Sequence, residues 1–312
     1  MLIYIIGVLS GIGLPVQTSI NSKLEKRLGS PFYASFFSFS GAVLFLIIAL
    51  LCTGGNPFFD TSKLSGEPLW IFAGGILGLI LVSINILSAP RIGSAETVIF
   101  CVLGQIIMGL LIDEFGLFGS REISLSIWRI IGAAFVITGV FIVVCDNKKV
   151  IFEEENLKRK MSFSFKCLLR TLGILAGVAA ACQVAVNGEL ARVMASRSIA
   201  AFISFLTGLL SCSIVVVFNL LFKGIHINKN EDNQWYLYTG GIFGVLCVFV
   251  NIYLVHNLGT GMAVVIALIG QIFGGVAVDR IGFLRPDKRP VTLRKILGAL
   301  VMILGTGIIQ FL

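Results

Sequence analysis

The sequence predicts an all-α integral membrane protein with ten transmembrane helices, arranged as two five-helix inverted repeats. The first observation is composition: 57% of the residues are hydrophobic and 13% are charged, about half the charged share of a soluble domain. The second is that apolar residues form runs of about 20, the length that crosses the hydrocarbon core of a bilayer. The third is internal repetition, because polar and glycine positions of the first half recur in the second half at a constant offset, as from Gln17 to Gln183.

Ten apolar spans follow one another along the chain, five in each half. The first half contains spans at 2–21, 32–52, 69–88, 94–112 and 128–145, and the second half contains spans at 168–187, 199–222, 237–255, 260–278 and 294–312. The first span has no basic segment before it and no cleavage site, so we expect a permanent helix rather than a removable signal peptide. Repeated Gly-x-x-x-Gly steps, such as Gly7 to Gly11 and Gly74 to Gly78, favour close packing between helices in lipid.

A charged stretch at 147–167 separates the two halves and is the most polar part of the chain. We therefore expect a first repeat at 1–146, a linker at 147–167 and a second repeat at 168–312. Because each half has an odd number of spans, the second half enters the membrane from the side opposite to the first. Two similar units in opposite orientation form an inverted repeat, with a pseudo-two-fold axis in the membrane plane.

Basic residues indicate the orientation of these spans. Of the 24 Lys and Arg residues, 19 lie in loops 1–2, 3–4, 5–6, 7–8 and 9–10 or in the adjoining span ends. The positive-inside rule places those loops in the cytoplasm. We therefore expect a multi-pass protein of the cell (cytoplasmic or inner) membrane, with the linker cytoplasmic and both termini external. The basic excess reflects this orientation, so nucleic acid is not an expected partner.

The motifs that would indicate an enzyme are missing from the sequence. It has no Walker A motif, no Gly-x-Ser-x-Gly elbow and no His-Glu-x-x-His pair, and it contains only 2 histidines. The 7 cysteines are an odd number without Cys-x-x-Cys spacing and lie mostly in apolar runs, so we expect small buried hydrophobic residues. The sequence therefore predicts a protein that is not an enzyme, with no metal site and no cofactor.

The polar residues inside the apolar spans form a set that occurs twice. Gln17 and Asn21 lie one helical turn apart on the same face of the first span, and Gln183 and Asn187 repeat this spacing. The alternative to a functional role is that these amides hold helices together, at about 0.6 kcal/mol each. The duplication favours a site, because intramembrane polar residues tend to mark transport pathways. Six amides are the predicted substrate-binding residues: Gln17, Asn85, Gln105, Gln183, Asn251 and Gln271.

Five further residues are predicted to act in gates or in ion coupling: Asn21, Glu96, Asp113, Asn187 and Asp279. Inversion would place Asn21 with Asp279 near the cytoplasmic face, and Asn187 with Asp113 near the external face. We hypothesise that each pair helps to form one gate. The alternative is that both acids are solvated carboxylates at the membrane surface.

Glu96 breaks the repeat, because its equivalent in the second half is Met262. A carboxylate in the first turn of a helix is stabilised by the helix dipole, which favours a capping role for Glu96. The alternative is a titratable group for proton coupling or for a cationic substrate.

Several of these motifs resemble the YdcZ-like family, also called domain of unknown function 606, in the drug/metabolite transporter superfamily. They are the Gln-x-x-x-Asn step of the first span, Ser-Phe after an aromatic residue (Phe36 to Phe39, Phe202 to Phe205), and Gly-Gln with an Asp eight residues after the Gln. Segments 106–116 and 272–282 each resemble the end of the family's fourth helix. The resemblance covers nearly the whole chain, one family unit per half, so the chain is similar to a fused pair of units.

This resemblance implies secondary transport, because members of the family are described as exporters. We expect a secondary active transporter that exports a small metabolite or toxic organic compound by alternating access, through a polar cavity between the repeats. One alternative is a flippase of a lipid-linked group, and another is a non-transporting membrane scaffold or sensor subunit. A scaffold has little need of a duplicated polar set in its core. The expected partners are the lipid bilayer, a small-molecule substrate and protons as the coupling ion, with the oligomeric state left open.

Overall fold

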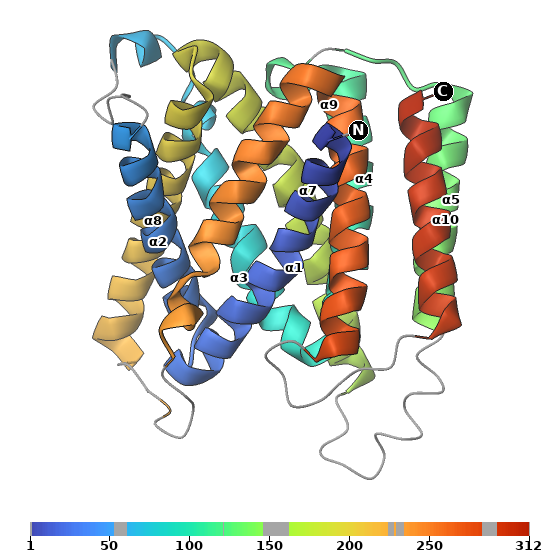
Figure 1. The fold of residues 1–312 in the computed structure, drawn as a ribbon, viewed down its shortest axis with the longest axis horizontal. Helices are drawn as coiled ribbons and strands as arrows, with labels where there is room; N and C mark the ends of the chain where they lie inside the picture. Colours follow the sequence, from blue (N-terminus) through green and yellow to red (C-terminus); the bar gives the residue numbers. More distant parts are fainter. Residues whose placement is uncertain are drawn as a thin grey trace.

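The computed structural model describes residues 2–52, 61–120, 122–145, 162–223, 228, 234–282 and 292–311. Across these ranges the protein is helical, with no strand (Figure 1). Four short 3-10 turns lie between the long helices: η1 (Thr61–Leu64), η2 (Leu69–Phe72), η3 (Leu117–Gly119) and η4 (Trp235–Tyr238). The long helices are α1 (Leu2–Leu28), α2 (Pro31–Cys52), α3 (Gly74–Ile92), α4 (Ser94–Phe115), α5 (Ile127–Cys145), α7 (Phe163–Met194), α8 (Arg197–Lys223), α9 (Gly240–Ile281) and α10 (Leu293–Phe311).

Length and apolarity identify the helices that can cross a membrane. In the described ranges, 6 helices qualify: α1, α2, α3, α4, α7 and most of α8. Helix α5 and the first part of α9 carry shorter apolar stretches, Ile127–Ile142 and Gly240–Asn251. Large apolar side chains are exposed on the outer faces, such as Leu44 at 60% and Phe218 at 63%. A surface of this kind is stable against lipid tails and unstable in water, so the fold is that of a multi-pass membrane protein.

The two halves differ at the connection that follows their third predicted span. In the first half, Gly93 adopts φ 99° and separates α3 from α4. In the second half, predicted spans 237–255 and 260–278 belong to one helix, α9, of 42 residues. A straight helix of 42 residues would be about 63 Å long at 1.5 Å per residue, roughly twice the hydrocarbon core. Figure 1 shows how this length is accommodated, because the two arms of α9 run in opposite directions through the bundle.

The first helix of each half is longer than the sequence predicts. Helix α1 continues past the predicted end at residue 21 to Leu28, and α7 runs from Phe163 to Met194 instead of 168–187. The C-terminal part of the predicted linker therefore belongs to α7, whereas residues 146–161 lie outside the described ranges. Apolar residues on these extensions, such as Leu24 and Leu190, are fully buried, which explains why the helices extend.

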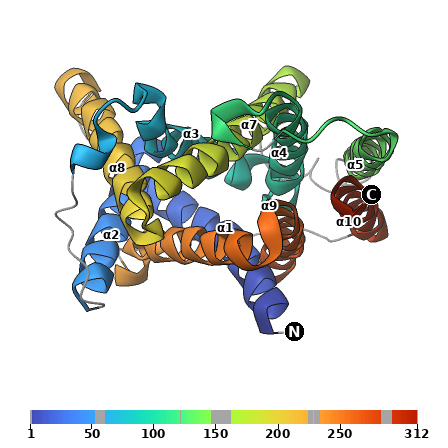
Figure 2. The same cartoon turned by 90° about the horizontal axis from the view of Figure 1, so that it is seen from above.

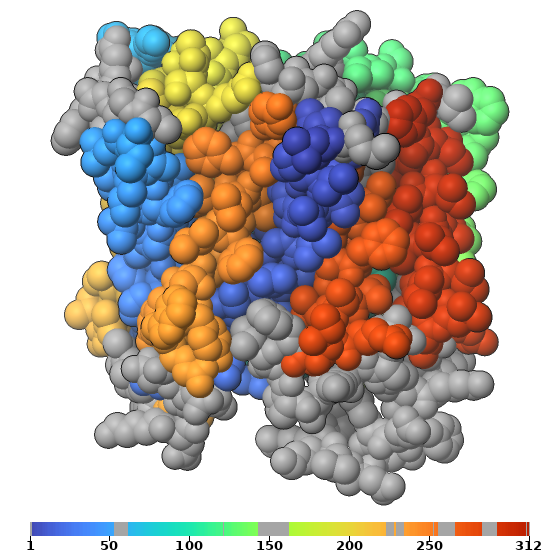
Figure 3. Space-filling model, viewed as in Figure 1, coloured from blue at the N-terminus to red at the C-terminus, as the bar shows by residue number. Residues whose placement is uncertain are grey.

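The halves interlock through their first helices. Helix α1 packs mainly against both arms of α9, and α7 packs mainly against α3 and α4. Figure 3 shows α1 lying between the two arms of α9. Helix α2 packs on α8, and α5 packs on α10. Every first-half helix therefore has its most extensive contact with a second-half helix.

Glycines allow the interlocked helices to approach closely. A Cβ atom on Gly11 of α1 would lie 2.8 Å from the Cα of Gly270 in α9. The equivalent Gly177 of α7 approaches α4 in the same way, because its Cβ would lie 2.8 Å from the backbone N of Gln105. Both distances are far below van der Waals contact, so only glycine fits at these two crossings.

Helices α5 and α10 form a pair at one end of the molecule (Figure 2). A Cβ on Gly132 would lie 2.6 Å from the carbonyl O of Gly305, and a Cβ on Gly139 would lie 2.6 Å from the carbonyl O of Gly298. Since Gly298 and Gly305 are the repeat equivalents of Gly132 and Gly139, the contact is self-complementary. The two halves are therefore joined here by equivalent glycine-containing faces of α5 and α10.

Candidate functional site

A cavity of about 1000 Å³ lies between the two halves. All six predicted substrate-binding amides line it, together with Asn21, Asp113 and Asn187. Glu96 and Asp279 do not line it. The lining comes from both halves, so each half contributes one copy of the duplicated amide set. Their position makes these amides available to a solute, and their role in binding stays a prediction.

The cavity reaches one face of the bundle, and we call this end the mouth. The mouth is formed by the end of α4 with η3 and by the facing end of α7 with the start of α8; its residues are Asp113, Phe118, Gly119, Ser120, Glu189, Arg192 and Arg197. At the opposite end, the lining described by the structure stops at Asn21, Ala89 and Ser94. The cavity is therefore accessible from the mouth.

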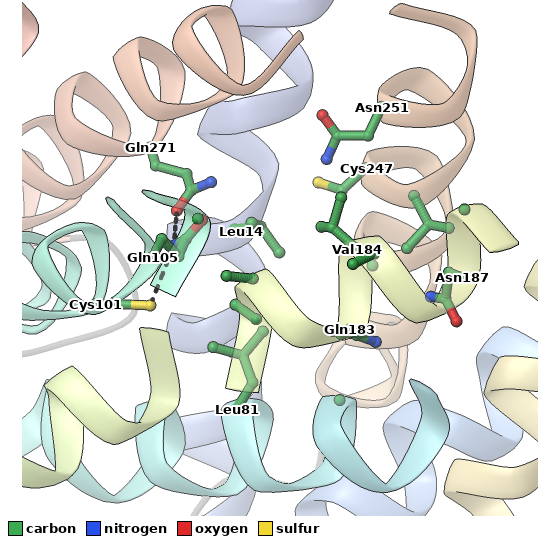
Figure 4. Close-up of a pocket in the computed structure, with 18 of the residues that line it drawn as sticks. Leu14, Leu81, Cys101, Gln105, Gln183, Val184, Asn187, Cys247, Asn251 and Gln271 are labelled. Atoms are coloured by element: carbon green, nitrogen blue, oxygen red, sulfur yellow. Dashed lines mark hydrogen bonds between the residues drawn. The ribbon is translucent and has the colours of Figure 1, made fainter. Parts of the chain in front are cut away.

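Two pairs of repeat-equivalent residues meet across the cavity. Nε2 of Gln105 donates a hydrogen bond to Oε1 of Gln271 at 3.5 Å, and the two residues are 166 positions apart, the repeat offset (Figure 4). Phe39 and Phe205 have the same offset, and their ring centroids are 5.8 Å apart. Each pair joins equivalent positions of the two halves. The halves therefore meet at matching residues beside the cavity.

Two buried thiols accompany the amides in the cavity wall. Gln105 also donates to Sγ of Cys101 at 3.3 Å, and Sγ of Cys247 donates to the carbonyl O of Ser10 at 2.8 Å. Figure 4 shows Cys247 beside Asn251, on the side of the cavity away from Gln105 and Gln271. No group of three His, Cys, Asp or Glu side chains in the described part of the chain could hold a metal ion.

Gln17, Asn21 and Ser38 form a hydrogen-bonded set, which we call the closed amide–serine set. Oγ of Ser38 accepts from Nε2 of Gln17 at 3.3 Å and from Nδ2 of Asn21 at 3.1 Å. All three residues are buried. The amide of Asn21 also fills the space where Gly240 would carry a Cβ, which would lie 2.9 Å from the Cγ of Asn21. This set fastens α1 to α2 and α9 at the end away from the mouth.

The repeat equivalents Gln183, Asn187 and Ser204 form the open amide–serine set. Neither amide donates a hydrogen bond to Ser204 within the ranges that the structure describes, whereas the buried Oδ1 atoms of Asn187 and Asn21 both lack a partner there. Asn187 packs against Gly74 as Asn21 packs against Gly240. The two sets thus have the same residues and backbone contacts, and they differ in whether the serine joins the amides.

Asp279 caps the first turn of α4. Its Oδ1 accepts from the backbone N–H of Ser94 and its Oδ2 from the backbone N–H of Ala95, each at 2.9 Å. The carboxylate is 4% exposed. The interpretation as a solvated surface carboxylate is therefore wrong for Asp279, because the end of α9 meets the start of α4 and the helix dipole there favours an anion.

Asp113 has a different environment from its repeat equivalent. Its Oδ2 accepts from a guanidinium nitrogen of Arg129 at 2.8 Å, and Arg129 also donates to the carbonyl O of Ile123 at 3.2 Å. The Asp113 side chain is 30% exposed and the Arg129 side chain 7%. At the same mouth, Nε of Arg192 donates to Oε2 of Glu189 at 2.8 Å. The two acidic residues of the mouth are therefore both in ion pairs.

Glu96 is buried in an ion pair with Arg170 of α7. Nε of Arg170 donates to Oε1 of Glu96 at 2.8 Å. The Glu96 side chain is 8% exposed and the Arg170 side chain is 16% exposed. The guanidinium also lies over the Phe100 ring, 5.7 Å from its centroid. Since the repeat equivalent of Arg170 is Tyr4, both charges of this pair are lost together in the other half. The pairing favours a structural role for Glu96.

Sequence reasoning did not identify several residues that the structure brings to the site. Ser38 and Ser204 occur in the duplicated Ser-Phe motif, so their constant offset was a usable signal. Arg129 has the repeat equivalent Lys295, and both residues are buried. A duplicated cation near the end of a span was a second usable signal. Arg170 carried no such signal, because its partner Glu96 is 74 positions away in the sequence.

Comparison with known proteins agrees with this duplicated architecture. The family model described as "Putative inner membrane exporter, YdcZ" matches the chain twice, at residues 2–142 and 168–308. No curated protein showed significant similarity to the chain. The two matches cover most of the sequence, and each corresponds to one of the two repeats. The chain is therefore a multi-pass inner membrane protein that belongs to the YdcZ family of exporters and carries two family units in one polypeptide.

Proposed function

We propose that this protein is a secondary active transporter that exports a small organic molecule by alternating access. The observation that carries the proposal is the cavity of about 1000 Å³ between the halves, lined by the duplicated amides and reaching one face. Its volume is at the upper end of the range for small-molecule sites. A central site between two related units is the arrangement that alternating access requires.

The reciprocal contacts support an inverted repeat of two five-span units, 1–146 and 168–312, joined by the linker 147–167. Contact of α1 with α9 has its counterpart in contact of α7 with α3 and α4. Figure 1 supports opposite orientation, because α1 and α7 run in opposite directions along the bundle. The two arms of α9 then serve as separate spans, which gives ten spans in total.

The amide–serine sets support a mechanism with two related gates. In the present state Ser38 joins Gln17 and Asn21 at the closed end, whereas Ser204 does not join Gln183 and Asn187 near the mouth. Alternating access would exchange these states: the open set forms its hydrogen bonds as the mouth closes, and the closed set loses them. We assign Asp279 to the gate at the closed end and Asp113 to the gate at the mouth.

The positive-inside rule supports an orientation for this cycle. The mouth carries Arg192 and Arg197 of the basic-poor side, whereas the closed end adjoins Lys23 and Arg27 of the basic-rich side. We propose that the mouth faces outward, with the linker cytoplasmic and both termini external. The start of α1 and the end of α10 lie on the same face of the bundle (Figure 1), as this orientation needs.

Transport is tested by comparing cavity amides with an amide elsewhere in the membrane. Cells that express the protein are challenged with a panel of toxic organic compounds, and efflux of any compound that the protein protects against is then measured in proteoliposomes. Gln17→Ala and Gln183→Ala should both abolish efflux; Gln183→Ala should leave the melting temperature nearly unchanged, and Gln17→Ala should lower it only slightly, because it removes one hydrogen bond to Ser38. The control is Asn219→Ala, because Asn219 lies outside the cavity lining and donates to the carbonyl O of Val215 in its own helix, at 2.9 Å.

Two results would contradict the proposal. If Gln17→Ala and Gln183→Ala lower the melting temperature strongly but leave efflux intact, the amides hold helices together and do not bind substrate. If the wild-type protein moves no compound, as a scaffold or sensor would, the transporter assignment fails. Movement of a lipid-linked group, without movement of soluble compounds, would identify a flippase.

A further inference from the structure

Building on the proposed transport function, we infer that the cavity selects an uncharged solute that combines hydrogen-bond donors and acceptors with an apolar part. The inference goes beyond the exporter family, which specifies no substrate charge. It depends on how charges and amides are distributed along the cavity, from the mouth to the closed end.

The charged residues of the lining all lie at the mouth. Within the described part of the chain they are Asp113, Glu189, Arg192 and Arg197. Asp113 is paired with Arg129, and Glu189 is paired with Arg192. From Gln105 and Gln271 to the closed end, the described lining holds only amides, hydroxyls, thiols and apolar groups. Glu96 and Asp279 lie outside the lining, and their carboxylates are held by Arg170 and by the backbone N–H groups at the start of α4.

This distribution disfavours an ion in the inner cavity. A charge that leaves water for a protein interior costs several kcal/mol unless a counter-charge replaces its hydration. Amide dipoles offset only part of that cost, because each carries a partial charge. A permanent cation or anion would therefore lose binding energy on moving inward from the mouth. An uncharged polar solute has a much smaller desolvation cost.

The inner amides are available to such a solute. Gln183 and Asn251 line the cavity and make no hydrogen bond within the described residues, and Asn85 lines the cavity beside them. Each amide side chain offers two N–H donors and one carbonyl acceptor, so the three together can satisfy a ligand of either polarity. Figure 4 shows Leu14, Leu81 and Val184 beside the labelled amides of the cavity, and these three side chains provide surface for an apolar part of the ligand.

Three probes with one pyridine ring and different charges test the inference. They are nicotinamide, which is neutral, nicotinate, which is an anion, and 1-methylnicotinamide, which is a cation. Each is titrated against the purified protein, and binding is measured as stabilisation against thermal unfolding, followed by tryptophan fluorescence. We expect nicotinamide to bind at least about tenfold more tightly than either charged probe.

Variants locate the effect in the inner cavity. Gln183→Ala should weaken nicotinamide binding several-fold, and the control Asn219→Ala should leave it unchanged. Asn251→Asp introduces an uncompensated carboxylate, so it should reverse the preference in favour of 1-methylnicotinamide. The inference would be overturned if the wild-type protein preferred a charged probe. It would also be overturned if all three probes stabilised the protein equally, or if no probe stabilised it.

The result is independent of the transport assay. Selective binding of a charged probe would remove the neutral-solute inference and leave efflux as a valid test of the transporter. Selective binding of nicotinamide by a protein that moves no compound would support the neutral-solute inference and remove the transporter assignment.

Discussion

Replacing Glu96 and Arg170 by the residues of the other half should reveal how this buried ion pair contributes to stability. The two side chains meet at 2.8 Å and are 8% and 16% exposed. Coulomb attraction at this distance is about 6 kcal/mol at an effective dielectric constant of about 20. The desolvation of both ions offsets most of that gain, so the net stabilisation by the pair is small. Removing one partner leaves the other charge buried, which costs about 3–5 kcal/mol.

A double-mutant cycle separates these quantities. Glu96→Met and Arg170→Tyr each introduce the residue found at the equivalent position, Met262 or Tyr4. We expect each single variant to lose about 3–5 kcal/mol and the double variant to lose no more than about 2 kcal/mol. The coupling energy would then be at least about 4 kcal/mol.

The assay is equilibrium unfolding of the purified protein in mixed micelles, with increasing amounts of a denaturing detergent. All four proteins are measured under the same conditions. Single variants that cost less than about 1 kcal/mol would show that the charges are hydrated or paired elsewhere. A double variant that costs the sum of the single variants would show that the two side chains act independently.

Three further predictions address packing, gating and orientation. Gly177→Ala should lower the free energy of unfolding by about 1–3 kcal/mol by overpacking the α7–α4 crossing. Gly188→Ala on the same helix should be neutral or stabilising by up to about 1 kcal/mol, because nothing lies within 4 Å of the position of an added Cβ. Both variants are measured in the same unfolding assay. Ser38→Ala should loosen the closed end and Ser204→Ala should hold the mouth open, which labelling of a reporter cysteine in the cavity from each side would detect as opposite changes; equal changes would contradict the two-gate mechanism. An impermeant thiol reagent added to intact cells should label a cysteine beside Leu312 and spare one in the linker 147–167, and the reverse pattern would invert the proposed orientation.

The sequence was sufficient to predict features that repeat or have a fixed spacing. Apolar runs predicted the helices, which the structure contains. The offset between Gln17 and Gln183 predicted two related units, and the two family matches confirm them. The Gln-x-x-x-Asn spacing placed both amides on one helix face, and both now line the cavity. Local periodicity and internal comparison need no knowledge of the tertiary structure, which is why these features were accessible.

Features that depend on contacts between distant segments were not accessible. Asp279 lies at the C-terminal end of its own helix, where the helix dipole disfavours an anion, and the meeting of α9 with α4 gives it two backbone donors. Likewise, nothing local indicated that Glu96 would find Arg170 on α7.

The interlocking of α1 with α9 also has a consequence for biosynthesis. The main partner of the first helix is among the last to be made, since α9 begins at Gly240. At about 5–20 residues per second, α1 stays in the membrane for roughly 10 to 50 seconds before α9 emerges. During that time Gln17 and Asn21 have to be shielded from lipid by α2 or by a component of the insertion machinery. The hydrogen bonds of Ser38 with these two amides need only α1 and α2, so they can satisfy most of the polar face until the second half arrives.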